Sequence, residues 1–256
     1  HKKLAAVLND NGQFSEALQA VEKSRELFPA DFYADQADLD ELLYSIYKKM
    51  GKVNEALKYF EKLTEYKLSS FEKKYSKEFG EIVVVADGTN NWRKRVFPQY
   101  KANRKKSREK SSVDWNEVFR ILNTVRDEIR DNFPYKVVHQ DGCEADDSIA
   151  QIATATQEFG RYEPVMIISA DKDFAQLVSE NIFMYKPARM GNGIEIWGIS
   201  EVQKKFEVER PEQVIDFLGM MGDSVDNIPG LPGVGKKTAQ KFIAQYGSME
   251  ALLANT

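Results

Sequence analysis

The sequence contains very little cysteine and histidine. Its single cysteine, Cys143, excludes an internal disulfide bond and is consistent with a reducing compartment. We interpret Cys143 as a small buried side chain rather than as a thiol nucleophile. His139 is one of only two histidines, and we expect it to serve packing or the surface rather than a metal ion.

Long apolar runs are also missing. No stretch of about eighteen apolar residues occurs, and no charged segment followed by an apolar one opens the chain. We therefore expect neither a membrane span nor a secretion signal, and a cytoplasmic location, which is the host cytoplasm if a phage encodes the chain. The sequence begins with His1 rather than methionine and stops at Thr256, just after an expected helix, which suggests a piece of a longer protein.

The overall charge is only weakly negative. The 256 residues are 42% hydrophobic, enough for a substantial core, and we expect two structural units. The formal net charge of −4 argues against a nucleic-acid partner. Eight of the 40 acidic residues, however, lie in four short clusters. The other 32 face 36 lysines and arginines, so the rest of the chain has an excess of four positive charges.

Three of the four acidic clusters lie where short apolar stretches end. Residues 82–86, 135–138 and 165–169 are rich in β-branched side chains, which predicts strands, and acids follow each one. Because the carboxyl ends of parallel strands line one crevice, these acids can converge on divalent metal ions. One such cluster alone is more often a solvated turn or helix start. The eight acids are Asp87, Glu144, Asp146, Asp147, Asp171, Asp173, Asp223 and Asp226.

Residues 1–68 are expected to be helical throughout and carry no evident chemistry. Residues 11–18 and 50–57 repeat one pattern, a glycine-centred turn between two amphipathic helices. The pattern resembles the tetratricopeptide repeat, with Ala17 and Ala56 where paired helices would cross and Pro29 closing the first unit. The spacing differs from that family's period, so a generic helical hairpin is nearly as good an interpretation. Segments of this kind commonly bind proteins, which makes a protein partner an expectation.

A strongly basic segment follows the first expected strand. Residues 92–110 contain nine lysines and arginines against one acid, with Trp92, Phe97 and Tyr100 among them. A solvated basic helix would explain the charge alone. Aromatic side chains within a basic run favour nucleic acid, because the cations can meet phosphates while the rings stack on bases.

Two helices are expected on either side of the second acidic cluster. The spacing of apolar residues predicts an amphipathic helix over 114–132, and another over 148–157 that places the cluster at its amino end. The first of these helices is expected to bury Val118, Ile121, Leu122, Val125 and Ile129.

A hairpin and two further helices are expected before the last acidic cluster. Residues 181–186 and 194–198 predict paired strands around Gly191-Asn192-Gly193. Ser200 with Gln203 predicts a capping box for the next helix, and a helix is expected from Pro211 to Met221.

A glycine-rich turn precedes the last expected helix. Residues 230–236 match the first seven letters of a nucleotide-binding P-loop, but Lys237 stands where that motif needs serine or threonine. We also expect no strand before it, which argues against nucleotide hydrolysis. The turn instead presents backbone amides and a helix amino end to a phosphate. The candidate DNA-binding residues here are Gly233, Gly235, Lys236 and Lys237.

Taken in order, the motifs resemble those of the structure-specific 5'-nucleases. That family includes flap endonucleases, the 5'-3' exonuclease domain of bacterial DNA polymerase I and phage ribonuclease H of the T-even type. The resemblance covers residues 70–256, and the surroundings of Trp92 and Phe97 look most like the phage members. The matching motifs are Asp87-Gly88, Tyr100 to Arg104, Glu144 to Asp147, Ser169 to Asp173 and Gly222 to Gly230.

The resemblance implies an α/β fold of the PIN-like kind. It would have three layers, a mostly parallel sheet and a helix-hairpin-helix at residues 228–247, after an all-α repeat segment. We expect a repeat segment at 1–68, a catalytic domain at 69–221 and a DNA-binding region at 222–256.

The resemblance also implies hydrolysis of phosphodiesters by two Mg²⁺ or Mn²⁺ ions, with a K⁺ ion at the helix-hairpin-helix. Lys101 and Arg104 would stabilise the scissile phosphate. The first metal would be held by Asp87, Glu144, Asp146 and Asp147, and the second by Asp171, Asp173, Asp223 and Asp226. The remaining DNA-binding candidates are Arg93, Lys94, Tyr100, Lys105 and Lys106.

Two functions therefore stand as hypotheses. The first is a metal-dependent 5'-3' exonuclease or flap endonuclease acting on 5' ends, flaps or RNA primers on DNA. The second is a catalytically impaired protein that binds branched DNA and recruits a partner through residues 1–68. It is motivated by a departure, because family members begin with a strand ending in an Asp ligand, and helical repeats stand in its place here. Asp10 ends the only comparable run, whose sequence favours helix, and the family's last helices are not among these residues.

Overall fold

A computed structural model describes residues 1–27, 33–111, 113–160, 162–187 and 193–255. The chain divides into two compact units. Unit 1 comprises residues 1–82 and 111–135, and unit 2 comprises residues 83–110 and 136–256. The expected domain limits after residues 68 and 221 remain a prediction. Among the described residues, no helix is both long enough and apolar enough to cross a bilayer.

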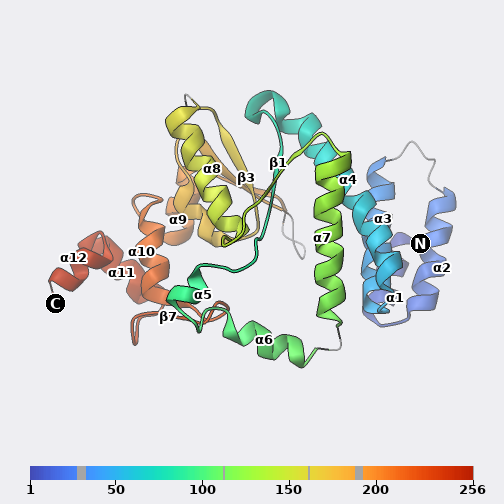
Figure 1. Ribbon diagram of the computed structural model, residues 1–256, viewed down its shortest axis with the longest axis horizontal. Helices are drawn as coiled ribbons and strands as arrows, with labels where there is room; N and C mark the ends of the chain where they lie inside the picture. The colour runs from blue at the N-terminus through green and yellow to red at the C-terminus, as the bar shows by residue number, and fades with distance from the viewer. Residues whose placement is uncertain (28–32, 112, 161, 188–192, 256) are drawn as a thin grey trace. The chain divides into compact units, whose positions relative to one another are not determined.

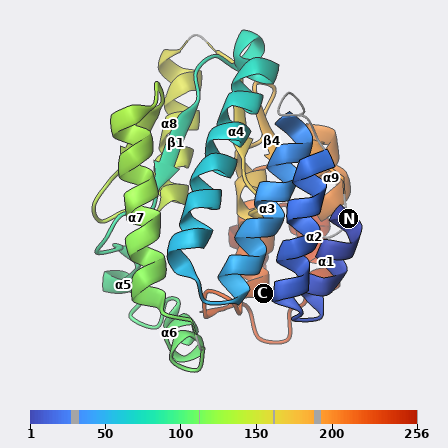
Figure 2. The same cartoon turned by 90° about the vertical axis from the view of Figure 1, so that its right-hand side faces the viewer.

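Unit 1 is built from helices. Figure 2 shows α4 between α3 and α7, and these helices pack against one another in that order. Every described element between residues 1 and 68 is helical, as the sequence predicts. The five helices are α1 (Lys2–Asp10), α2 (Phe14–Leu27), α3 (Tyr33–Lys49), α4 (Val53–Phe79) and α7 (Trp115–Asn132).

The two glycine-centred turns of unit 1 are confirmed. Gly12 and Gly51 take positive φ values of 74° and 69°, which an L side chain rarely adopts, and each joins two helices. Ala17 and Ala56 are buried, as expected for small residues where helices pack closely. Membership of the tetratricopeptide family stays a prediction, and Pro29 lies outside the described residues.

Helix α7 and the end of α1 test two sequence expectations for unit 1. Helix α7 begins after Asp114, whose carboxylate accepts the backbone N–H groups of Asn116 and Glu117, and it buries Val125 and Ile129. Leu122 is 48% exposed, so its assignment to the core is wrong. It lies beyond the edge of the buried stripe, which helical spacing alone does not delimit. Asp10 ends α1, as the helical interpretation expects, and pairs with Lys49.

Unit 2 contains two separate sheets that each include one pair of parallel strands. Strand β1 (Val83–Ala86) pairs in parallel with β2 (Lys136–His139), with Val83 opposite Lys136. Strand β3 (Val165–Ile168) pairs in parallel with β4 (Ile182–Lys186), and β5 (Glu195–Trp197) pairs antiparallel with β4. The expected strands, the parallel pairing and the hairpin are confirmed. The hairpin residues Gly191 and Asn192 lie outside the described residues.

Helix α8 (Ala145–Phe159) packs against both of these sheets. It packs against both β1 and β3, although these strands belong to different sheets among the strands described. Figure 1 shows α8 beside both strands. The carboxyl ends of β1 and β3 therefore lie near the amino end of one helix, which is where three of the acidic clusters begin.

The core of unit 2 lies beneath the C-terminal helices. Its buried side chains include Met184, Val202, Met220 and Ile243. The remaining elements are α5 (Arg93–Val96), α6 (Ala102–Glu109), η1 (Lys172–Leu177), α9 (Ile199–Phe206), α10 (Gln213–Met221), β6 (Gly222–Asp223), β7 (Ile228–Pro229), α11 (Lys236–Tyr246) and α12 (Met249–Ala254).

The predicted capping box at Ser200 and Gln203 is wrong. Helix α9 begins two residues earlier, with Gly198 as its N-cap. The carboxylate of Glu201 accepts the backbone N–H of Gly198 at 2.9 Å. A glycine cap has no side-chain acceptor, so the sequence carries no cap signal at this position.

Candidate metal and nucleic-acid site

Asp87 follows β1 and is fixed against the start of α8. Its carboxylate accepts the backbone N–H of Ala145 at 2.8 Å. The next residue, Gly88, donates its N–H to the carbonyl of Cys143 at 2.9 Å. A Cβ atom at Gly88 would lie 1.8 Å from the carbonyl oxygen of Gln140, so only glycine lets the chain pass here. The Asp-Gly pair thus joins the end of β1 to the amino end of α8.

The second acidic cluster forms the first turn of α8. Glu144 is the N-cap residue, and Asp147 accepts its backbone N–H at 2.9 Å, which makes a capping box. Asp146 lies between them in the sequence. Negative side chains are stabilised at this end of a helix by unsatisfied N–H groups and by the helix dipole. Helix capping therefore explains why the carboxylates gather here before any ligand is considered.

The third and fourth clusters are held by short turns. Asp171 caps η1 by accepting the N–H of Asp173 at 3.0 Å, and its own N–H donates to the Ser169 hydroxyl. Asp223 accepts the backbone N–H groups of Val225 and Asp226 at 2.8 and 3.2 Å. Each turn fixes the backbone around its acids without neutralising them.

The acids from separate elements lie close enough to perturb one another. Burial, with the negative charges of Asp171, Glu144 and Asp87, raises the pKa of Asp146 to about 6. The pKa of Asp173 is raised by burial first, then by Asp171 and by the acids of the fourth cluster. All four clusters therefore contribute charge to one acidic region of unit 2.

Three cations from the basic segment reach into this acidic region. Arg93 donates to Asp147 at 2.6 Å, Lys101 donates to Glu144 at 2.5 Å, and Arg104 pairs with Asp226. Burial would raise the pKa of Glu144, but hydrogen bonds from Lys101 and the Tyr100 hydroxyl hold it below its ordinary value. Among the described residues, no three His, Cys, Asp or Glu side chains are grouped to hold a metal ion. Arg93, Lys101 and Arg104 offset part of the negative charge in this region.

The hydroxyl of Tyr100 forms hydrogen bonds with two of the acidic clusters. Its hydroxyl lies 2.7 Å from Glu144 and 3.3 Å from Asp226, and the residue is only 5% exposed. Burial and these carboxylates raise the pKa of the phenol well above its ordinary value, so it stays protonated and donates. The sequence did not reveal this inward position, because a tyrosine in a basic run is equally suited to stacking on a base. Its part in DNA binding stays a prediction.

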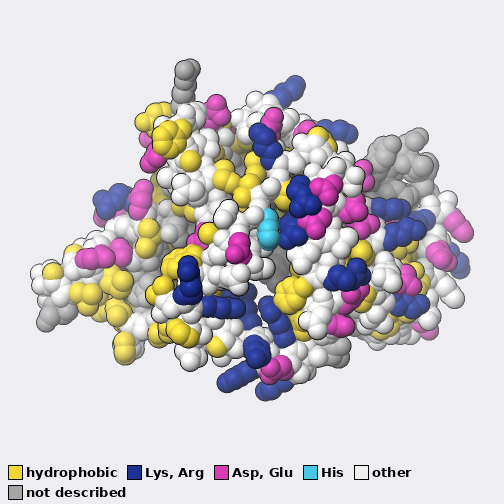
Figure 3. All heavy atoms as spheres, viewed as in Figure 1, with side chains coloured by type: hydrophobic (Ala, Val, Ile, Leu, Met, Phe, Trp, Pro, Cys, Tyr) yellow, Lys and Arg dark blue, Asp and Glu magenta, His cyan; other side chains and the backbone are white. Residues whose placement is uncertain are grey.

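The remaining cationic candidates lie on the surface of unit 2. Lys94 in α5 and Lys105 and Lys106 in α6 are exposed, and dark blue side chains gather along these helices in Figure 3. Lys236 and Lys237 open α11 and are also exposed. Among the described residues, no ion pair joins these two lysines to the acidic clusters. The structure thus places two basic surfaces on unit 2, of which only the first adjoins the acids.

The turn before α11 has the backbone geometry that a phosphate contact needs. Gly233 takes a φ of +75° and Gly235 is the N-cap of α11, which leaves the first N–H groups of the helix open.

Sequence reasoning missed two features of the site. The Nζ atom of Lys172 lies 3.4 Å from the carboxylate of Asp223. Its position between Asp171 and Asp173 is the only sequence feature that indicates a place near the acids. Asn227, in the left-handed region with a φ of 59°, donates to the carbonyl of Gln99 at 2.8 Å. No local pattern links Asn227 to Gln99, because the two residues are far apart in the sequence.

Unit 2 is thus a mixed α/β unit whose acids follow parallel strands and face side-chain cations. Such an arrangement is suited to phosphate groups. The chain matches the family model described as the 5'-3' exonuclease N-terminal resolvase-like domain over residues 24–207, and the model of the C-terminal SAM fold over residues 209–256. It belongs to the 5'-3' exonuclease family.

Relatives and solved structures agree with this assignment. The chain is 37% identical to the 5'-3' exonuclease of Aquifex aeolicus over 175 residues, covering 68% of this chain and 55% of that protein. It is 36% identical to DNA polymerase I of Rhizobium leguminosarum over 178 residues, covering 67% of this chain and 16% of the polymerase. Bacteriophage T5 5'-exonuclease, solved with zinc bound, shares the fold with a TM-score of 0.66 and 23% identity, over 77% of this chain and 70% of that one. The chain therefore spans about half or less of these curated relatives.

Proposed function

We propose that this chain is a divalent-metal-dependent 5'-nuclease that hydrolyses phosphodiesters at 5' ends, flaps or RNA primers on DNA. The observation that carries the proposal is the acidic region itself. Burial first, and then acids from neighbouring clusters, raise the pKa of Asp146 and of Asp173. Lys101 and Arg104 enter the same region from the basic segment. Membership of the 5'-3' exonuclease family supports the same activity.

The donor chemistry fits two Mg²⁺ or Mn²⁺ ions, because these cations prefer carboxylate oxygens and would relieve the repulsion around Asp146. The ions would supply positive charge and an activated water at the phosphodiester. Their proposed ligands are Asp87, Glu144, Asp146 and Asp147 for one ion and Asp171, Asp173, Asp223 and Asp226 for the other.

The chain's own cations have a separate part in the proposal. Lys101 is only 16% exposed and Arg104 is 42% exposed, and each pairs with a carboxylate. When a phosphate enters, these side chains can exchange a carboxylate partner for a phosphate oxygen, which holds the scissile group in place. Tyr100 keeps its hydroxyl on Glu144 and Asp226 and so orients two of the acids.

DNA on either side of the scissile phosphate would meet the two basic surfaces. Arg93, Lys94, Lys105 and Lys106 would contact phosphates next to the acidic region. Backbone N–H groups at Gly233 and Gly235, with Lys236 and Lys237, would hold the duplex farther along, and we extend the proposal to a K⁺ ion at that turn. Replacing K⁺ by Na⁺ at constant ionic strength is then expected to weaken duplex binding, and unchanged affinity would remove the ion from the proposal.

A branched-DNA-binding protein without hydrolysis is the second candidate. Two observations favour it: the described residues place no three acids around one point, and Asp10 lies in α1 instead of ending a strand. In this case the basic surfaces would bind DNA, and residues 1–68 would recruit a protein partner.

One experiment separates the two candidates. A 5'-labelled flap duplex is incubated with the chain and Mg²⁺, and both cleavage and retention of the substrate are measured. The Asp171→Ala, Asp173→Ala double variant is the test, and Glu180→Ala, an exposed acid outside the four clusters, is the matched control. Cleavage by the wild type and Glu180→Ala but not by the double variant supports the nuclease. Retention without cleavage by any of them supports the binding protein.

A further inference from the structure

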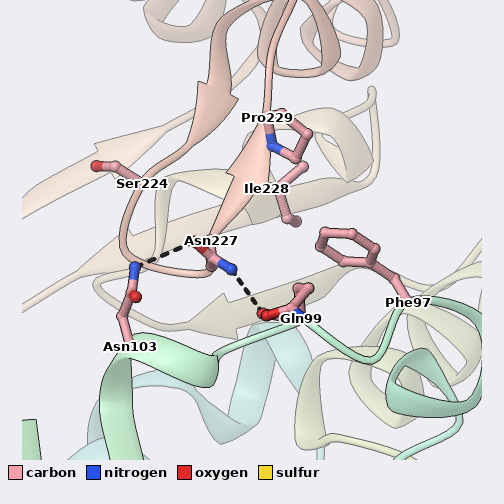
Figure 4. A pocket seen from close by; sticks show the side chains of 7 residues that line it. All are labelled: Phe97, Gln99, Asn103, Ser224, Asn227, Ile228 and Pro229. Atoms are coloured by element: carbon pink, nitrogen blue, oxygen red, sulfur yellow. Dashed lines mark hydrogen bonds between the residues drawn. The ribbon is translucent and has the colours of Figure 1, made fainter. Parts of the chain in front are cut away.

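A surface pocket in unit 2 lies beside the candidate catalytic cations. It has a volume of about 360 Å³. One wall comes from the segment between α5 and α6, and the other from the turn between β6 and β7 (Figure 4). The lining residues are Phe97, Gln99, Asn103, Ser224, Asn227, Ile228 and Pro229. None of them is a proposed metal ligand, and Phe97 is one of the aromatic residues of the basic segment.

The two walls are fastened to each other by hydrogen bonds. The side-chain amide of Asn103 donates to Asn227 at 3.2 Å, and the amide of Asn227 donates to the carbonyl of Gln99 at 2.8 Å. Figure 4 shows both bonds across the floor of the pocket. Beside them the backbone N–H of Lys101 donates to the carbonyl of Asp226 at 2.9 Å. These hydrogen bonds hold the two walls together next to Lys101.

The pocket combines an aromatic ring with open polar groups. Phe97 is half-buried and lies beside Ile228, which is 41% exposed, so both present apolar surface to a flat group (Figure 4). The side-chain amide of Gln99 and the hydroxyl of Ser224 make no hydrogen bond within the described part of the chain, so they are available to a ligand. Amides and hydroxyls both donate and accept. A flat group with a polar edge, such as a nucleobase, matches this combination.

Charge around the pocket indicates that the base is part of a nucleic acid. Lys101 and Arg104 lie on the same segment as Phe97 and Gln99, and the α6 lysines extend the positive surface. A base in the pocket would bring its own phosphate toward these cations. A neutral apolar ligand would leave the amide of Gln99 and the hydroxyl of Ser224 without partners, which disfavours it.

We infer that this pocket binds an unpaired nucleobase of the strand whose phosphate lies at Lys101 and Arg104. The inference rests on the proposed function, because it assumes that nucleic acid reaches the acidic region. It adds that one base of that strand leaves the base stack and enters this pocket.

The test measures binding of a 5'-flap DNA in EDTA, so that cleavage does not enter. A single abasic nucleotide is moved along the flap and the junction, and each DNA is titrated against the wild type, Phe97→Leu and Gln99→Ala. Phe97→Leu keeps the apolar volume and removes the aromatic face. Phe159→Ala, which truncates an aromatic residue that is 83% exposed at the end of α8, is the matched control.

At one position the abasic nucleotide is expected to weaken binding to the wild type by about 10-fold, the size of one lost base–aromatic stack. Phe97→Leu is expected to bind the intact DNA about 10-fold more weakly and to be insensitive to the abasic nucleotide at that position, because the two changes remove the same contact. Gln99→Ala is expected to give a smaller loss at the same position, and Phe159→Ala none.

The inference is overturned if the abasic nucleotide has no effect at any position, or if its effect multiplies with that of Phe97→Leu. Magnesium-dependent cleavage by the wild type is read separately. Cleavage without the abasic effect would leave the nuclease proposal standing and remove the base pocket. The abasic effect without cleavage would support the pocket in a DNA-binding protein, and no DNA binding at all would refute both.

Discussion

Gly222 stands where a single added methyl group is expected to cost several kcal/mol of stability. It follows α10 with φ of 68° and ψ of −179°, a region that is almost confined to glycine. A Cβ atom there would lie 2.3 Å from the backbone nitrogen of Gly230 and 2.6 Å from the carbonyl oxygen of Ile228. Backbone strain costs about 1–3 kcal/mol and forced overpacking about the same, so Gly222→Ala is expected to lower the free energy of unfolding by roughly 2–6 kcal/mol.

Gly219, which lies within α10, is the matched control. A Cβ atom at Gly219 would meet only the terminal methyl group of Met249 at 3.6 Å, which is ordinary contact. Alanine is favoured over glycine inside a helix, so Gly219→Ala is expected to raise the free energy of unfolding by about 0.5–1 kcal/mol. Two identical substitutions three residues apart should therefore act in opposite directions.

Urea unfolding followed by the fluorescence of Trp197 measures both changes. Trp197 is 4% exposed in the core that also contains Met220, so it reports on unit 2, and the other two tryptophans are replaced by phenylalanine in every variant. With a urea slope of about 2–3 kcal/mol per M, Gly222→Ala is expected to lower the midpoint by roughly 1–2 M. A midpoint equal to that of the wild type, or to that of Gly219→Ala, would refute the reasoning.

Three further predictions concern other parts of the chain. Asp114→Ala removes the N-cap of α7 and is expected to cost about 1 kcal/mol of stability in unit 1, whereas Asp114→Asn should cost little, and equal urea midpoints for the two would count against the cap. Ile243→Ala empties a position that is 2% exposed and is expected to cost about 2–5 kcal/mol in the Trp197 transition, so a loss below about 1 kcal/mol would mean that the core refills the cavity. The Lys105→Ala, Lys106→Ala double variant is expected to reduce the slope of log affinity for DNA against log salt concentration by about 2, and an unchanged slope would place both lysines off the phosphate path.

The elements carrying the acids could be predicted from the sequence because their signals are local. Residues 83–86 and 165–168 are short β-branched runs, and the structure makes both of them strands with parallel neighbours. Asp87 follows the first strand directly and Asp171 lies three residues after the second, so the strand predictions placed both at the ends of these strands. The raised pKa of Asp146, caused partly by both of these acids, agrees with that placement.

Contacts between distant segments could not be predicted. Nothing in the pattern of residues 92–110 tells which side chains turn inward, because Tyr100, Lys101 and Arg93 find their carboxylate partners more than forty positions away. The same holds for Leu122, since periodicity identifies an apolar stripe but not the neighbour that covers it. The sequence therefore shows which charged side chains are present, whereas packing determines which of them come into contact.

Two separate sheets of unit 2 carry acids of the acidic region. Among the strands described, β1 shares no backbone hydrogen bond with β3, so Asp87 and Asp171 are carried on separate pieces that meet under α8. Ladder hydrogen bonds fix strand spacing narrowly, whereas side chains packed beneath a helix can slide by small amounts. The distance between these two carboxylates can therefore change by a small amount without breaking a backbone hydrogen bond of either sheet.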